Sequence, residues 1–210
     1  MTKHQNNKEN SILNAAREEF LDKGYDGART TSIAKRAGVT HAMLHYYFKC
    51  KEELFGRIFT DFISDVATNL GLLFSDSDKP LLERVREGIT LHFNYVMANP
   101  HLPLFVIREI VSRPDRIDII KPILVNNVRE LTIMLQQSID IAIANGEITP
   151  NIDAPTLLID MLSLNVFPFL VHPAYQAVVG EEVGEINSFL EQRKQENIEL
   201  ITRRLTPNKQ

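Results

Sequence analysis

Side chains that can bind a polyanion gather in one short stretch of the sequence. Residues 40–51 read THAMLHYYFKCK and hold two histidines, two tyrosines and two lysines. Hydroxyl, imidazole and ammonium groups of this kind donate hydrogen bonds to phosphate oxygens and to base edges. The chemistry that this stretch indicates is therefore the binding of nucleic acid.

The same stretch has two other interpretations. His41 and His45 lie four residues apart, which suits a metal pair on a helix, but no third Cys, Asp or Glu stands at a matching spacing. Cys50 could sense redox state, although a lone surface thiol is more often incidental. The sequence also has no nucleophile elbow, glycine-rich phosphate loop or paired cysteine cluster. We therefore predict no metal, no cofactor and no enzyme.

Two short helices around a glycine must position these side chains. Residues 33–37 indicate a short helix that stops at Gly38, and a second one starts at Thr40 and runs to about Tyr47. Helices this short are unstable alone, so they must pack on the apolar face of residues 12–20. This is the helix-turn-helix layout, in which the second helix enters the DNA major groove.

The second short helix offers both kinds of DNA contact. Its first residues would touch base edges, and the residues that follow would bind phosphates. A lysine at the start of the next helix adds a phosphate site, because helix N-termini attract anions. The predicted contacts are Thr40, His41, Ala42 and Met43, then His45, Tyr46, Tyr47 and Lys51.

Charge is distributed unevenly along the chain. The 210 residues carry a net charge of −4, which divides into +3 over residues 1–60 and −7 over residues 61–210. Only the basic end suits a polyanion. Hydrophobic residues make up 44% and charged residues 24%, which is typical of a soluble globular protein.

Targeting signals are not apparent in the sequence. Residues 1–10 are polar and form no secretory signal, and the single cysteine fits a reducing compartment. The longest apolar run, residues 157–171, is interrupted by Asp160, Asn165 and Pro168. We expect a cytoplasmic protein with no membrane span.

The remainder of the chain predicts a helical body. Apolar residues recur at helical spacing, and no stretch alternates with period two, so we expect an all-α fold of about nine helices. We expect Gly24 to end the first helix and Pro122 to open a later one. The apolar run of residues 157–171 is too exposed for a monomer surface, which predicts a homodimer through the last two helices.

At these residues the sequence resembles the TetR family of bacterial transcriptional regulators. The match runs over residues 12–55, through AAREEFLDKGYDGA and IAKRAGVTHAMLHYYFKCKEELF, with no gaps against the family's spacing. The resemblance implies a further DNA contact at Thr30, which otherwise reads as a helix N-cap. Four positions depart from the family. His45 stands where a tyrosine is usual, and Tyr47 stands where a histidine is frequent. Ala28 replaces a threonine or serine, and His41 replaces a lysine or arginine, which would make its contact sensitive to pH.

The resemblance also implies a helix-turn-helix DNA-binding domain, residues 1–52, and a helical ligand-binding and dimerisation domain, residues 53–210. A small, often hydrophobic effector would bind in the second domain, although core packing is the commoner role for each apolar candidate. Arg108 and Glu109 would contact a polar effector group or form a structural bridge. The candidate lining residues are Phe62, Phe93, Met97, Phe105, Arg108, Asn127 and Phe167.

These observations predict a homodimeric repressor of a near-palindromic DNA operator, released by a small-molecule effector. Activation of transcription is an alternative, because the geometry of DNA binding does not set the sign of regulation. Two further alternatives are a helical adaptor protein that does not bind DNA and an all-helical enzyme.

Overall fold

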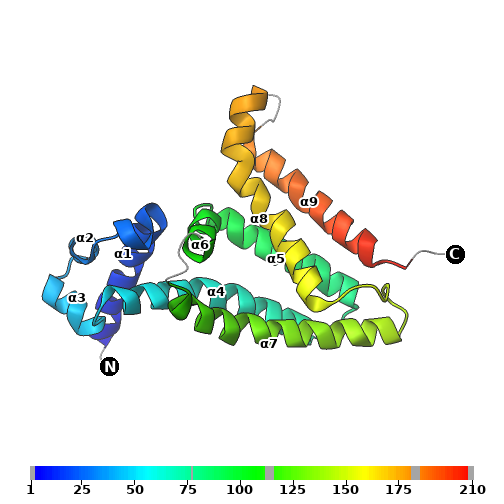
Figure 1. Ribbon diagram of the computed structural model, residues 1–210, viewed down its shortest axis with the longest axis horizontal. Helices are drawn as coiled ribbons and strands as arrows, with labels where there is room; N and C mark the ends of the chain where they lie inside the picture. Colours follow the sequence, from blue (N-terminus) through cyan, green and yellow to red (C-terminus); the bar gives the residue numbers. More distant parts are fainter. Residues whose placement is uncertain (1–2, 77, 112–115, 181–184, 208–210) are drawn as a thin grey trace. The chain divides into compact units, whose positions relative to one another are not determined.

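The computed structural model describes residues 3–76, 78–111, 116–180 and 185–207. Within these ranges the chain forms nine α-helices and no strand, which confirms the predicted all-α fold (Figure 1). The helices are α1 (Lys3–Gly27), α2 (Thr30–Arg36), α3 (His41–Tyr47), α4 (Lys51–Ser75), α5 (Leu81–Ala98), α6 (Leu102–Val111), α7 (Ile117–Ala144), α8 (Ala154–Val179) and α9 (Ile186–Leu205).

The chain divides into two compact units. The head comprises Met1–Ser64 and Leu104–Val125, and the body comprises Asp65–Pro103 and Asn126–Gln210. Helices α4 and α7 contribute residues to both units. The predicted domain boundary after residue 52 concerns function and stays a prediction.

In the head, α1 supplies the apolar face on which the two short helices pack. Ile12, Ala16 and Phe20 are fully buried at successive turns of α1, as are Ile33 of α2 and Leu44 of α3. Burying an aliphatic side chain of this size stabilises a fold by about 1.5–3 kcal/mol. Helices of seven residues need this tertiary support, because one or two turns cannot offset the entropy of nucleation.

Helix α1 breaks at Gly24, where we expected the first helix to end, and a short helical segment follows it to Gly27. Gly24 has a φ of +66°, and helical structure extends beyond this kink to Gly27. The amide of Ala28 still donates to the Gly24 carbonyl at 3.2 Å. The glycine therefore redirects the chain at the predicted place, because only glycine adopts this φ without strain.

Helix α7 begins five residues before the proline that we expected to open it. It starts at Ile117, so Pro122 lies inside the helix. The ring removes the N–H that would bond to the carbonyl of Asp118. Both Asp118 and Pro122 are exposed, so water can replace that hydrogen bond.

The body has a continuous apolar core. Helix α5 packs against α8 and α9, and α8 packs against α9 (Figure 1). Helices α4 and α7 add further apolar side chains. The largest core residues are Leu70, Phe74, Leu81, Val85, Ile89, Leu131, Leu135, Ile139, Leu157, Leu158, Met161, Ile198, Ile201 and Leu205.

Helix α8 is unbroken although Pro168 lies within it. Proline has no N–H, so the carbonyl of Leu164, four residues earlier, loses its usual helical donor. Asn197 of α9 donates to that carbonyl oxygen at 2.8 Å and to Asn165 Oδ1 at 3.1 Å. A buried amide from the neighbouring helix thus restores the hydrogen bond that proline removes.

Helix α8 is apolar over a greater length than we predicted. Ala154–His172 spans 19 residues with a mean hydropathy of 1.6, so by length and composition it could cross a membrane. We expected no run of this length because Asp160, Asn165 and Pro168 interrupt it, but these residues are too few to lower its mean hydropathy. One of them, Asn165, is fully buried and donates to the Ile89 carbonyl of α5 at 3.1 Å. That side of α8 therefore packs inside the body.

Candidate nucleic-acid interface

A tight turn around Gly38 joins α2 to α3. The Val39 amide donates to the Ala34 carbonyl at 3.0 Å, and the Gly38 amide donates to the Lys35 carbonyl at 3.2 Å. Gly38 has a φ of +67°, a conformation in which any other residue would be strained. The turn therefore needs the glycine at which we expected the short helix to stop.

Thr40 caps the N-terminus of α3 as predicted. Its hydroxyl oxygen accepts a hydrogen bond from the Met43 amide at 3.2 Å, and its backbone is extended. A threonine cap of this kind stabilises a helix by about 1 kcal/mol. Thr30 plays no such part in α2, whose N-cap position is Arg29 and lacks a side-chain cap.

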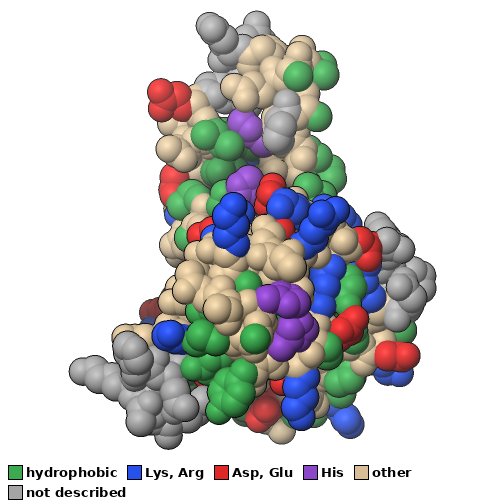
Figure 2. Space-filling model, turned by 90° about the vertical axis from the view of Figure 1, so that its left-hand side faces the viewer, with side chains coloured by type: hydrophobic (Ala, Val, Ile, Leu, Met, Phe, Trp, Pro, Cys, Tyr) green, Lys and Arg blue, Asp and Glu red, His purple; other side chains and the backbone are tan. Residues whose placement is uncertain are grey.

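Most of α3 faces solvent. Leu44 is its buried residue, whereas His41, Ala42, His45 and Tyr46 are exposed, Tyr46 by 76%. Met43 and Tyr47 are half-buried. Figure 2 shows histidine side chains at the surface of the molecule, with lysine and arginine side chains near them. The exposed side of α3 thus presents donors and small side chains together.

Contacts connect several of the predicted residues. Thr30 Oγ1 of α2 lies 3.0 Å from His41 Nε2 of α3. The rings of His41 and His45 meet edge to face, with centroids 4.4 Å apart. Tyr46 and Tyr47 meet in the same way at 5.4 Å. The start of α2 and the first turns of α3 therefore share one surface.

Lys51 belongs to a different cluster of the head. Its Nζ lies 4.5 Å from the centroid of the Tyr25 ring, and the guanidinium of Arg116 lies 4.4 Å from the same centroid. Burial, and then the charge of Arg116, lower the pKa of Lys51. The Tyr25 hydroxyl donates to Glu52, while burial and then this contact raise the pKa of Tyr25. Lys51 is therefore held over an aromatic ring rather than free in solvent.

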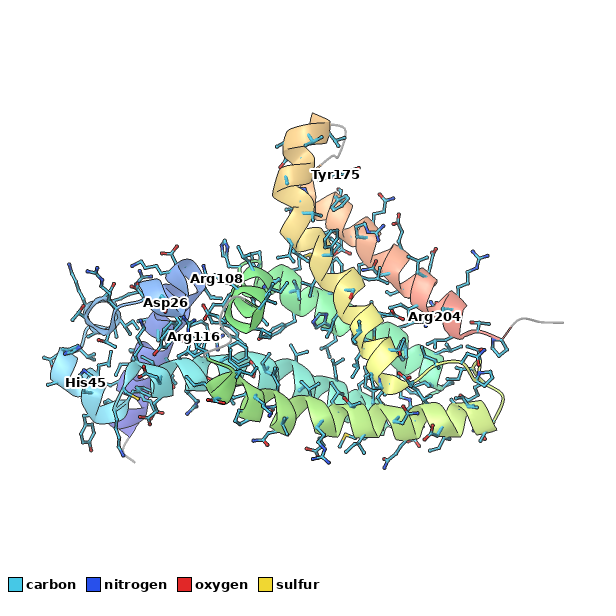
Figure 3. All side chains as sticks on the ribbon, viewed as in Figure 1. Asp26, His45, Arg108, Arg116, Tyr175 and Arg204 are labelled. Carbon is cyan, nitrogen blue, oxygen red and sulfur yellow. The ribbon has the colours of Figure 1, made fainter. Side chains whose placement is uncertain are left out.

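Buried ions surround this cluster. Glu109 of α6 accepts from the Tyr25 amide at 3.1 Å and pairs with Arg116. Arg116 also pairs with Asp26 at 2.6 Å, and Figure 3 shows Asp26, Arg108 and Arg116 directed toward one another. The sequence singled out Glu109, whose structural partners are now visible. Nothing in the sequence indicated a role for Arg116, because its partner Asp26 lies 90 residues away.

A second buried carboxylate lies on α1. Glu19 Oε1 accepts from Lys23 Nζ at 2.8 Å and from the Arg29 amide at 3.5 Å, and Ser32 Oγ donates to its Oε2 at 3.2 Å. Burial raises the pKa of Glu19, but the hydrogen bonds from Lys23, Arg29 and Ser32 outweigh burial, and the pKa falls below its usual value. Nothing in the sequence predicted a role for Glu19, because a helix-period pattern does not mark a carboxylate that faces another helix.

The predicted effector-lining residues divide between the two units. In the head, Phe62 and Phe105 are buried with ring centroids 6.1 Å apart, and Arg108 lies one turn beyond Phe105 on α6. In the body, Phe93 is buried against Phe169. Met97 and Asn127 are half-buried, and Phe167 is 62% exposed. The structure thus brings together Phe62 and Phe105, and the lining of an effector pocket stays a prediction.

No three His, Cys, Asp or Glu side chains among the described residues converge on a point that could hold a metal ion. Cys50 is exposed.

Residues 12–58 match a family model described as "Bacterial regulatory proteins, tetR family". The chain is 40% identical over 55 residues to an HTH-type transcriptional regulator, YdgC of Bacillus subtilis, covering 26% of this chain and 28% of that protein. It is 27% identical over 114 residues to a second one, YhgD of the same organism, covering 50% and 60%. These matches span less than two thirds of either relative.

Solved structures share the fold over nearly the whole chain. HlyIIR, a hemolysin II transcriptional regulator, has a TM-score of 0.65 at 22% identity, covering 97% of this chain and 99% of that one. FadR from Bacillus subtilis, a transcriptional regulator solved in complex with stearoyl-CoA, has a TM-score of 0.67 at 17% identity, covering 92% and 97%. The matched family and both relatives are described as regulators, in agreement with the predicted DNA-binding regulator. Residues 12–58 thus match the tetR family of bacterial regulatory proteins, and the solved neighbours share the fold of the chain.

Proposed function

We propose that this protein is a homodimeric transcriptional repressor that binds a near-palindromic DNA operator and leaves it when a small-molecule effector binds. The observation that carries the proposal is the exposed side of α3. Its donors stand on a seven-residue helix that Thr40 caps and that Leu44 anchors, next to a turn that requires glycine. A helix held in this way can enter a major groove without losing its shape.

Two sets of side chains would make the DNA contacts. Thr40, His41, Ala42 and Met43 would read base edges, with Thr30 holding His41 in place through their 3.0 Å contact. His45, Tyr46, Tyr47 and Lys51 would bind phosphates, which set the register of the protein without reading sequence. The histidines make both sets richer in neutral donors than a recognition surface of lysines and arginines.

Dimerisation would use the exposed apolar side chains of α8 and α9. Several large apolar residues of these helices stay uncovered in a single chain, which is unusual for a monomer surface. A second copy would cover them as a two-fold bundle of four helices. They are Ile159, Leu162, Phe167, Tyr175, Val178, Ile186 and Leu200. The two copies of α3 would then reach major grooves about 34–36 Å apart, or a multiple of that distance.

The effector would be a small molecule with a large apolar part. FadR, which shares the fold, was solved with stearoyl-CoA, a long acyl chain joined to a charged carrier. Phe62 and Phe105 offer aromatic surface in the head, and Arg108 on the same helix as Phe105 offers a cation for an anionic group. Phe93, Met97, Asn127 and Phe167 are the candidate lining residues of the body. Such a repressor acts on DNA in the cytoplasm, so a cytoplasmic location is part of the proposal.

Titration with duplex DNA tests this function. Purified protein should be a dimer by light scattering and should bind random-sequence duplex at low salt, with an affinity that falls steeply as salt rises. Lys51→Ala should reduce the slope of log affinity against log salt by about one phosphate contact. Tyr46→Phe should weaken binding to all sequences alike. Lys121→Ala, which changes an exposed lysine of α7, is the matched control.

Two outcomes would contradict the proposal. One is a monomer that ignores every duplex at low salt. The other is a Lys51→Ala variant that loses sequence discrimination while it keeps its non-specific affinity.

A further inference from the structure

Helix α2 lacks a cap of its own. Its first N–H groups have no partner within the helix, and such groups are usually satisfied by a Ser, Thr, Asp or Asn side chain at the N-cap. The N-cap position here is Arg29, whose side chain accepts no hydrogen bond, and the preceding residue is Ala28. Arg29 nevertheless has the extended backbone, with φ of −123° and ψ of 128°, that capped helices show.

A carboxylate from α1 occupies the place of a capping-box carboxylate. Glu19 accepts from the Arg29 amide, which is the N-cap amide, and from the hydroxyl of Ser32, three residues further on. In a capping box the carboxylate that receives the N-cap amide belongs to the third residue of the same helix. Here the third residue is Ser32, and the carboxylate comes from α1 instead.

The surroundings of Glu19 suit this role. Its side chain is 0% exposed, so its charge must be matched within the protein. Lys23 Nζ lies 2.8 Å from Oε1, and Arg36 Nη2, at the other end of α2, lies 3.4 Å from Oε2. A negative charge at a helix N-terminus is also favoured by the helix dipole. The carboxylate thus contacts both the start and the last turn of α2.

We propose that Glu19 caps α2 from the neighbouring helix α1, by accepting the N-cap amide as the carboxylate of a capping box does, and that it positions the DNA-reading surface. The link to that surface is Thr30, the first residue of α2, which lies next to the Arg29 amide in sequence and contacts His41 of α3. The statement about the cap is independent of function, whereas the statement about DNA reading rests on the proposed function. Glu19 is a positioning residue, because it contacts no predicted DNA-binding side chain.

The test compares Glu19→Gln with Glu18→Gln. Glu18 is the adjacent carboxylate on α1 and also pairs with Arg36, at 2.7 Å, but its side chain is 65% exposed. Both variants remove one negative charge and little volume. Glu19→Gln should speed amide hydrogen exchange in the first turn of α2 about five- to tenfold, the loss expected for one helix cap. Glu18→Gln should leave this exchange within twofold of the parent.

A local capping box should replace the distant carboxylate. Ser32→Glu places a carboxylate at the third residue of α2, where a capping box has it. Glu19→Gln should therefore speed α2 exchange in the parent and have little effect in the Ser32→Glu background, which is a double-mutant cycle. A role for Glu19 in general packing alone would produce the same loss in both backgrounds.

DNA binding supplies the second readout. The probes are a duplex selected from a random library by the parent protein and a random-sequence duplex of the same length. Glu19→Gln should lower affinity for the selected duplex about fivefold or more and change affinity for the random duplex less than twofold. Equal losses on both probes would overturn the positioning role.

The cap and the proposed function fail separately. Unchanged α2 exchange in Glu19→Gln would overturn the cap, whatever the DNA results are. A parent protein that binds neither duplex would contradict the proposed function, while the exchange data would still decide whether Glu19 caps α2.

Discussion

The head and the body bury different kinds of polar group. Among the described residues, the buried polar side chains of the head are Glu19, Glu109 and Arg116, all of them charged. Those of the body are mostly neutral and include Asn165, Asn197, Ser138, Thr202 and His92, beside Arg84 and Lys194. The head is therefore held by ion pairs, and the body by amides and hydroxyls.

The ion pairs of the head join segments that are distant in the chain. Glu109 on α6 receives the amide of Tyr25, 84 residues earlier, and pairs with Arg116. A buried pair of this kind adds little net stability over an apolar pair of the same size, but removal of one partner is costly. Such contacts specify one arrangement of α1, α6 and the start of α7 more than they stabilise it.

The body instead uses side-chain hydrogen-bond donors to complete its helices. Asn197 satisfies the Leu164 carbonyl that Pro168 leaves open. Arg84 donates to the Phe74 carbonyl at 2.7 Å, near the C-terminus of α4, where a cation is favoured by the helix dipole. Ser138 donates to the same carbonyl at 2.8 Å. We therefore expect the stability of the head to depend most on its buried charges, and the stability of the body on its buried hydrogen bonds.

The largest expected effect comes from removing one partner of the head's ion pair. Glu109→Ala removes the buried carboxylate partner of Arg116, leaves it only the exposed Asp26, and should destabilise the head by about 3–5 kcal/mol. Hydrogen exchange of α1 and α6 amides measures this loss within the head. Glu130→Ala, at an exposed site of α7, is the control. If the double variant Glu109→Met, Arg116→Met destabilises the head as much as Glu109→Ala does, the unpaired charge of Arg116 is not the reason for the loss.

Acid should weaken the body through His92. Burial lowers the pKa of His92 to about 4, from an ordinary value of 6.5, because burial disfavours the charged ring. The unfolded chain therefore binds a proton below about pH 6.5 that the folded chain refuses until about pH 4. Stability should fall as pH drops through this window, by up to about 3 kcal/mol.

Urea unfolding of the body at several pH values between 4 and 7 checks this loss. His92→Gln removes the titrating group and should flatten the dependence in this window. A parent and a variant with parallel pH profiles would show that another group is responsible.

A smaller effect should follow from Asn197→Ala. The change leaves the carbonyl of Leu164 without a donor inside the body, which should cost about 1–3 kcal/mol. Pro168→Ala restores the backbone N–H that normally bonds to that carbonyl, so the double variant should regain part of the loss. Hydrogen exchange in α8 and α9 gives the measurement. Additive losses in the double variant would mean that Asn197 acts elsewhere.

Local signals were enough to predict much of the fold and the surface of α3. The cap at Thr40, the turn at Gly38 and the exposed residues of α3 follow from side-chain types and their spacing within about ten residues. The same reasoning placed the end of the first helix at Gly24, where the backbone does leave helical geometry before a short further segment to Gly27. It also placed the start of α7 too late, since a proline inside a helix is tolerated where water can reach the open carbonyl.

The sequence by itself determined the helices and the donors of α3, because helix formation and capping depend on neighbours three or four residues apart. The tertiary structure alone decided that Glu19 reaches Arg29, that Glu109 meets Arg116 and that Asn197 repairs the break at Pro168. These contacts join different helices, and their partners are chosen by packing, which leaves no periodic trace in the sequence. A buried polar residue and a solvent-facing one look alike until the fold shows what lies opposite each of them.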